Sequence, residues 1–154
     1  MPFQRSKRMR CAAGYAGTRP PLDSRAMGDP EGHAATLVLV VDDDPSIRQV
    51  CRINLELDGH EVLEAESLAT TRALLAEEDV DVLVLDVHLG SERSDPLVAE
   101  CHARRPPIPV VLLTGSVDLA HPAVREADAV LPKPFELDQL VSTVRRLVHV
   151  HVHR

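Results

Sequence analysis

Four short apolar runs in this chain each lead to a polar residue, and this pattern constrains the fold more than any other feature. The runs LVLVV, DVLVLD, PVVLLT and AVLPK lead to Asp43, Asp86, Thr114 and Lys133. Apolar runs of this kind are typical of strands buried on both faces of a parallel sheet. Because ligands bind beyond the carboxyl ends of such strands, we expect the four polar side chains to share one crevice.

Segments with helical spacing separate these runs, with caps at several of their ends. Asp44 and Ser67 are suited to N-caps, Pro45 to a first helical turn and Gly59 to a helix end. We expect strands at residues 37–41, 61–65, 80–85, 108–113 and 129–131, and helices at about 45–58, 68–78, 95–105, 120–127 and 136–148. The alternation predicts an α/β fold of (βα)5 type, a doubly wound parallel sheet with helices on both faces.

The first part of the chain differs from the rest in composition and charge. Residues 1–35 have no apolar periodicity, and we expect a disordered basic tail there. Either translation begins at Met27 and the upstream residues are a start-site artefact, or the tail has a function. Residues 36–148 are expected to form one domain, and residues 149–154 a short C-terminal tail whose three histidines are a weak metal-binding candidate at most.

The charge and aromatic content argue against direct binding of nucleic acid. Residues 1–33 carry a net charge of +3 and residues 34–154 carry −10, which gives −7 for the whole chain. An acidic folded part disfavours DNA, and an aromatic content of 2% disfavours stacking on single strands.

Cysteine usage and hydropathy indicate the compartment. The three cysteines lie far apart without CxxC spacing, which predicts reduced thiols. No apolar stretch approaches the roughly 18 residues that a membrane span needs, and the basic N-terminus lacks the apolar core of a secretory signal. We expect a cytoplasmic protein without a membrane span.

Carboxylates at the strand ends suggest a magnesium site. Asp42, Asp43 and Asp86 would converge at the ends of the first and third strands. Carboxylates this close raise one another's pKa unless a cation lies between them. Mg²⁺ suits such a site, because it prefers hard oxygen ligands and retains waters and phosphate oxygens.

The remaining strand ends suggest a phosphoryl ligand. The Thr114 hydroxyl can donate to a phosphoryl oxygen, Gly115 leaves room for that group to enter, and Lys133 supplies a positive charge. Phosphoryl transfer requires mainly positioning and charge stabilisation from a protein, and these residues offer both.

These motifs together resemble the receiver domain of two-component response regulators. The matching segments are LVLVVDDDPSIR, DVLVLD, VVLLTGS and LPKPF, in the order that the family shows, with 28 residues from Asp86 to Thr114. The resemblance covers residues 36–148. It implies a flavodoxin-like fold with strand order 2-1-3-4-5 and a stand-alone, chemotaxis-regulator-like receiver.

The resemblance also assigns roles at the site. Asp86 would be the phosphoacceptor, receiving the group from a phosphohistidine of a histidine kinase or a histidine phosphotransfer protein. The Mg²⁺ ligands would be Asp43, Asp86 and the backbone carbonyl of His88, with Asp42 acting mostly through water. Thr114 would follow the phosphoryl group on activation.

Further roles concern the end of the fifth strand and the docking surface. Lys133 would pair with the phosphate, and the Lys133–Pro134 bond would be cis. Ile47 and Pro134 would flank the site and dock the phosphodonor. The Ile53 and Leu57 side chains lie off the expected core face of the first helix, as part of either a slightly rotated helix or a surface for a partner helix.

Three positions depart from the family pattern. Val130 stands where the family has a Tyr or Phe switch residue, which leaves Thr114 as the remaining switch. Gly90 and Ser94 replace a Pro and a Gly in the loop after Asp86, so we expect that loop to be more mobile than usual. The His88 side chain either tunes hydrolysis of the phosphoryl group or is merely exposed.

The leading hypothesis is a phosphorylatable switch that is not an enzyme beyond its own phosphorylation and dephosphorylation. It would act on a downstream protein effector as a monomer or weak homodimer. One alternative is an adaptor that works without phosphorylation. A hydrolase of the haloacid dehalogenase type is a weaker alternative, because His88 occupies the position where such enzymes carry a second Asp.

Overall fold

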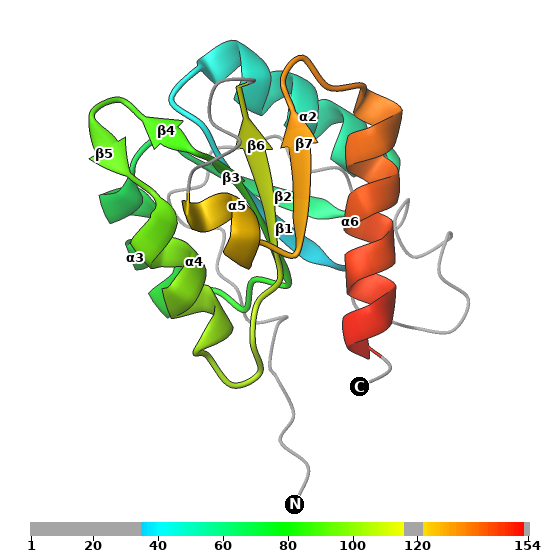
Figure 1. Ribbon diagram of the computed structural model, residues 1–154. Helices are drawn as coiled ribbons and strands as arrows, with labels where there is room; N and C mark the ends of the chain where they lie inside the picture. The colour runs from blue at the N-terminus through cyan, green and yellow to red at the C-terminus, as the bar shows by residue number, and fades with distance from the viewer. Residues whose placement is uncertain (1–34, 116–121, 153–154) are drawn as a thin grey trace, which may run out of the picture.

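The computed structural model describes residues 35–115 and 122–152, which form a single α/β domain (Figure 1). The tail expected at residues 1–35 and the alternative start at Met27 lie almost wholly outside the described residues. Among the described residues, no helix combines the length and apolar character that crossing a membrane would require.

Five parallel strands form the central sheet. They are β1 (Leu37–Val41), β2 (Glu61–Ala65), β3 (Val82–Asp86), β6 (Val110–Thr114) and β7 (Ala129–Pro132). The spatial order is β2-β1-β3-β6-β7, all pairs being parallel, which confirms the predicted order 2-1-3-4-5. All five residues of β1, β3 and β6 are buried, as expected for a sheet covered on both faces.

Helices cover both faces of the sheet, as Figure 1 shows. They are α2 (Pro45–Leu57), α3 (Leu68–Glu77), α4 (Asp95–His102), α5 (Pro122–Glu126) and α6 (Leu137–Val152). Residues from α3, α4 and α5 share one apolar cluster with Leu39 and Leu83, whereas residues from α2 and α6 share the other with Val40 and Val84. The alternation of side chains along each strand therefore supplies both cores.

The predicted helix signals act as expected. The Asp44 side chain accepts a hydrogen bond from the Ser46 amide at 2.9 Å, which caps α2. The Ser67 hydroxyl accepts from the Thr70 amide at 3.2 Å at the start of α3. Gly59 follows α2 with φ of 98°, a conformation that favours glycine.

The segment after Asp86 is the main departure from the predicted elements. It forms an antiparallel hairpin of β4 (His88–Leu89) and β5 (Glu92–Arg93), where we expected an irregular loop. Gly90 has φ of 61°, which suits the turn, and the Ser94 hydroxyl donates to the Val87 carbonyl at 2.7 Å. Ser94 is fully buried, so it joins the end of the hairpin to the core.

The ends of two helices also differ from the prediction. Helix α4 stops at His102, three residues before the expected end at 105. Pro106 directly follows Arg105, and the residue before a proline avoids the helical region, so the helix does not reach residue 105. Helix α6 continues through Val152, four residues beyond the expected helix end at 148. Since residues 137–152 contain no Gly or Pro, nothing in their sequence interrupts the helix.

Helix α2 exposes a stripe of apolar side chains. Ile53 is 42% exposed and Leu57 is 81% exposed, as expected for side chains off the core face. Val50 is also 42% exposed, although it is spaced like the buried residues of the helix. Cys51 and Leu55 provide the fully buried positions of α2, so its buried face is narrow.

Candidate functional site

Three carboxylates meet at the carboxyl edge of the sheet. Asp42 and Asp43 directly follow β1, and Asp86 is the last residue of the neighbouring strand β3. One carboxylate oxygen from each residue lies within 4.8 Å of the others. Asp42 is fully buried, Asp86 is 7% exposed and Asp43 is exposed, so the cluster opens to solvent on the Asp43 side.

Lys133 brings a positive charge to these carboxylates from the segment after β7. Its Nζ lies 3.2 Å from Asp42 Oδ2 and 3.4 Å from Asp86 Oδ2. The Lys133 amide donates to the Thr114 carbonyl at 2.6 Å, which links the ends of β6 and β7. Residues separated widely in the sequence thus form one charged cluster, as the strand-end pattern predicted.

The electrostatics of Asp86 and Lys133 are linked. Burial, followed by the negative charge of Asp42, raises the pKa of Asp86 to about 6 from its ordinary 3.8. Lys133 and the His88 amide oppose that rise in part. Burial would lower the pKa of Lys133, but the charges of Asp86 and Asp42 outweigh it and the pKa is raised, so the ammonium stays charged.

Hydrogen bonds fix each carboxylate differently. Asp42 Oδ1 accepts from the Asp44 amide at 2.9 Å, while its Oδ2 faces Lys133. Asp43 Oδ2 accepts from the Gly90 amide of the hairpin at 3.0 Å, and the His88 amide donates to Asp86 Oδ1 at 3.4 Å. Asp42 is therefore the most constrained of the three, and Asp43 the most open.

The donor set fits Mg²⁺. Hard carboxylate oxygens converge here, and the three carboxylates carry more negative charge than the Lys133 ammonium beside them can balance. Asp43 and Asp86 could bind a metal ion directly. Asp42 has both oxygens engaged by protein donors, which suits contact through water.

Thr114, Gly115 and Val130 lie at or near the ends of the neighbouring strands. Thr114 is fully buried, and its hydroxyl donates to the Gly115 carbonyl at 3.0 Å. Gly115 is half-buried and directly precedes the undescribed residues 116–121. Val130 is half-buried on β7, pairs with Leu112 and packs against the core cluster of α3, α4 and α5.

The expected docking residues lie close to the site residues in sequence, Ile47 four positions after Asp43 and Pro134 directly after Lys133. Ile47 is half-buried and packs against the α2 and α6 core, whereas Pro134 is exposed. The Lys133–Pro134 bond is cis, as the resemblance implied. The His88 side chain is exposed on β4, two residues after Asp86.

Two contacts at the site were not predicted from the sequence. The Gly90 amide binds Asp43, and the Arg48 guanidinium binds the Asp42 carbonyl at 2.7 Å. A glycine within a short polar loop signals a turn, yet it does not say which side chain the turn will contact. No sequence pattern indicated the contact of Arg48, because the atom that accepts its hydrogen bond is a backbone oxygen.

Sequence comparison decides the family. The family model of the response regulator receiver domain matches residues 38–145, which is more than half of the chain. The chain belongs to the response regulator receiver domain family. Such receivers are parts of two-component systems, and phosphorylation and magnesium binding are typical of them.

Individual receiver-containing proteins support this membership. Response regulator protein FleR of Pseudomonas aeruginosa is 35% identical over 115 residues, covering 73% of this chain and 24% of FleR. Transcriptional regulatory protein KdpE of Mycobacterium tuberculosis is 32% identical over 115 residues, covering 73% of this chain and 51% of KdpE. The receiver chain thus spans between about a quarter and a half of the length of these relatives.

A solved structure shows the same receiver fold. A response regulator from Thermotoga maritima superposes with a TM-score of 0.66 at 28% identity, covering 75% of this chain and 99% of that one. The α/β topology and the receiver family, expected from the strand-end motifs, are therefore confirmed.

Proposed function

We propose that this receiver accepts a phosphoryl group on Asp86 in a reaction that requires Mg²⁺. The observation that carries the proposal is the placement of the Asp86 carboxylate within 4.8 Å of Asp42 and Asp43 oxygens and 3.4 Å from the Lys133 ammonium. This arrangement holds a nucleophile, metal ligands and a cation at one point. The phosphodonor would be a histidine kinase or a histidine phosphotransfer protein of a two-component system.

The transfer is a displacement at phosphorus. A carboxylate oxygen of Asp86 forms the new P–O bond while the P–N bond to the donor imidazole breaks, and the bonding electrons return to that nitrogen. The Lys133 ammonium would neutralise the phosphoryl oxygens, and Thr114 would donate its hydroxyl to one of them. Bound Mg²⁺ would supply the positive charge that offsets the Asp43, Asp86 and phosphoryl oxygens.

The proposed output is a shift between two conformations of the surface made by α5, β7 and α6. Two features support this. The Lys133 amide donates to the Thr114 carbonyl, so a movement of Thr114 is passed to the end of β7. Val130 replaces the family's aromatic switch, which leaves Thr114 as the residue that responds.

Partner docking would use the residues around the crevice. We propose that Ile47 and the exposed Pro134 flank the acceptor site and contact the phosphodonor. A separate surface would bind a downstream protein effector. We further propose that the receiver works in the cytoplasm without binding nucleic acid itself, in agreement with the charge of −10 on residues 34–154 and with the buried free thiols of Cys51 and Cys101.

A small phosphodonor tests the proposal directly. The protein is incubated with Mg²⁺ and acetyl phosphate, and the mass is measured before and after hydroxylamine. We expect a hydroxylamine-labile adduct in the wild type, none in Asp86→Asn, and a strongly reduced amount in Asp43→Asn. If the wild type forms no adduct and Asp86→Asn binds the partner normally, the protein is instead a phosphorylation-independent adaptor.

A further inference from the structure

An arginine of α2 contacts the backbone of the site. Arg48, in the first turn of α2, donates from Nη1 to the Asp42 carbonyl at 2.7 Å. That carbonyl belongs to the peptide bond that joins Asp42 to Asp43. Because a peptide bond is planar, the contact restrains the orientation of the whole peptide unit between the two carboxylate-bearing residues.

The restraint matters most for Asp43. The Asp42 side chain has two further contacts, with the Asp44 amide and Lys133, and its own amide donates to the Ala65 carbonyl at 3.1 Å. Asp43 is exposed, and its carboxylate accepts one hydrogen bond from the Gly90 amide. The direction of the Asp43 side chain therefore depends on the peptide that Arg48 restrains.

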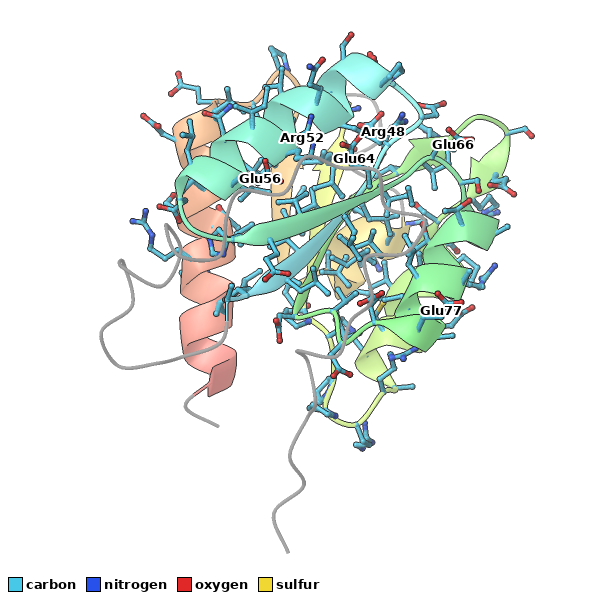
Figure 2. All side chains as sticks on the ribbon, turned by 180° about the vertical axis from the view of Figure 1, so that it is seen from behind. Arg48, Arg52, Glu56, Glu64, Glu66 and Glu77 are labelled. Carbon is cyan, nitrogen blue, oxygen red and sulfur yellow. The ribbon has the colours of Figure 1, made fainter. Side chains whose placement is uncertain are left out.

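Glu64 holds Arg48 in place from β2. Its Oε1 accepts from Arg48 Nε at 3.1 Å, and its Oε2 accepts from Arg52 Nε at 2.7 Å. Figure 2 shows these three side chains together between α2 and β2. The Arg48 side chain is only 15% exposed, so it has little freedom to adopt another arrangement.

The charge of Glu64 has a second effect. A guanidinium beside the Asp42 backbone would repel a metal cation, but a carboxylate 3.1 Å from the Arg48 Nε largely offsets that charge. Arg48 thus supplies a directional hydrogen bond with little electrostatic penalty for a cation.

We infer that Arg48, oriented by Glu64, is a positioning residue for metal binding by Asp43. The inference rests on the proposed Mg²⁺ site and adds to it a residue that acts through the backbone without contacting the metal. Removing a group that orients metal ligands typically lowers metal affinity about 10- to 100-fold. We expect Arg48→Gln to fall in that range.

Arg52→Gln is the matched control. Arg52 shares Glu64 with Arg48 and also pairs with Glu56 at 3.4 Å, so these ion pairs join it to side chains of α2 and β2. Both substitutions remove one guanidinium from the same cluster. A general loss of charge or stability would affect the two variants alike, whereas positioning through Asp42 would affect Arg48→Gln alone.

The experiment is a Mg²⁺ titration of the unphosphorylated protein, followed by the amide NMR shifts of the site. We expect Arg48→Gln to raise the Mg²⁺ Kd by about tenfold or more, Arg52→Gln to stay within about twofold of wild type, and Glu64→Gln to lie between them. Urea unfolding of each variant shows that the folded protein is being titrated.

Two results would overturn the inference. One is an Arg48→Gln Kd equal to that of wild type; the other is an equal loss in Arg48→Gln and Arg52→Gln. Wild type and Asp43→Asn are titrated in parallel. If the wild type does not bind Mg²⁺, the proposed function itself is rejected. If the wild type binds Mg²⁺ and Arg48→Gln binds it equally well, only the role of Arg48 is rejected.

Discussion

The Lys133 ammonium lies 3.2 Å from a carboxylate oxygen of Asp42, a residue 91 positions earlier in the chain. This pair spans the carboxyl edge of the sheet, because Lys133 follows the edge strand β7 and Asp42 follows the inner strand β1. Lys133 also faces Asp86 at 3.4 Å. It is therefore the cation that allows two buried carboxylates to remain near each other.

Removal of that cation should destabilise the fold. In Lys133→Met, the carboxylates of Asp42 and Asp86 lose their compensating charge, and we expect the free energy of unfolding to fall by about 1–3 kcal/mol at pH 7 without Mg²⁺. The pKa of Asp86 should rise further, because Lys133 lowers it in the wild type. Urea unfolding at pH 7 and pH 5 checks this; an equal loss at both values would argue against it, since Asp86 is mostly protonated at pH 5.

Neutralising the acceptor should have the opposite effect on stability. The pKa of Asp86 is raised to about 6 in the folded protein, so the folded state holds this proton more tightly than the unfolded state. The charged carboxylate therefore costs stability above pH 6, and that cost disappears as the pH falls toward 4. We expect Asp86→Asn to stabilise the metal-free protein by about 1–3 kcal/mol at pH 7.

A pH series of urea unfolding tests this prediction. The stability difference between Asp86→Asn and wild type should shrink steadily between pH 7 and pH 4. Addition of Mg²⁺ should also shrink it, because a bound cation removes the cost in the wild type. A difference that is constant with pH would show that the ionisation of Asp86 is not its cause.

His60 should lower the stability of the fold on acidification, over part of the pH range in which Asp86 titrates. Burial, opposed by the Asp58 carboxylate 3.1 Å away, lowers the pKa of His60. As the pH falls below 6.5, the unfolded state takes up the proton first, so stability is lost on acidification. Protonation of Asp86 raises stability over the same pH range, so the measurement is made in the Asp86→Asn background. There, His60→Gln should reduce the loss of stability between pH 7 and pH 5.5.

Among the described residues, two glycines have a positive φ, and their substitution should distinguish an effect on stability from an effect on metal binding. Gly59 and Gly90 have φ of 98° and 61°, and an added Cβ would meet no atom within 4 Å at either site. Each change to Ala should therefore cost about 1 kcal/mol through backbone strain alone. Only Gly90→Ala should also weaken Mg²⁺ binding, because the Gly90 amide donates to Asp43. Urea unfolding and a Mg²⁺ titration distinguish the two effects, and an equal change of Kd in both variants would contradict this account.

The sequence predicted those parts of the fold that depend on local patterns. The four apolar runs marked four of the five main strands, and Asp44, Ser67 and Gly59 marked helix ends, because capping and burial need particular residue types. The convergence of Asp42, Asp43, Asp86 and Lys133 was also predictable, since parallel strands bring their carboxyl ends together.

The remaining features depend on contacts between distant residues. Strands β4 and β5 have two residues each, too few to show any periodicity, and the hairpin is joined to the core by the buried Ser94. Arg48 acts on a carbonyl oxygen, which every residue possesses. The exposure of Val50 follows from how α2 lies on the sheet, which helical spacing alone does not determine.

Strand β3 lies at the centre of the sheet, hydrogen-bonded to β1 on one side and β6 on the other, with all of its residues buried. Its last residue is Asp86, so the proposed chemistry would take place on a strand that is paired on both sides and buried along its whole length. Any displacement caused there must appear in the surrounding segments: the β4–β5 hairpin, the end of β6 and the turn that bears Lys133. The proposed acceptor would in this sense be a stationary reference point, and the mobility on which a signal depends would belong to its neighbours.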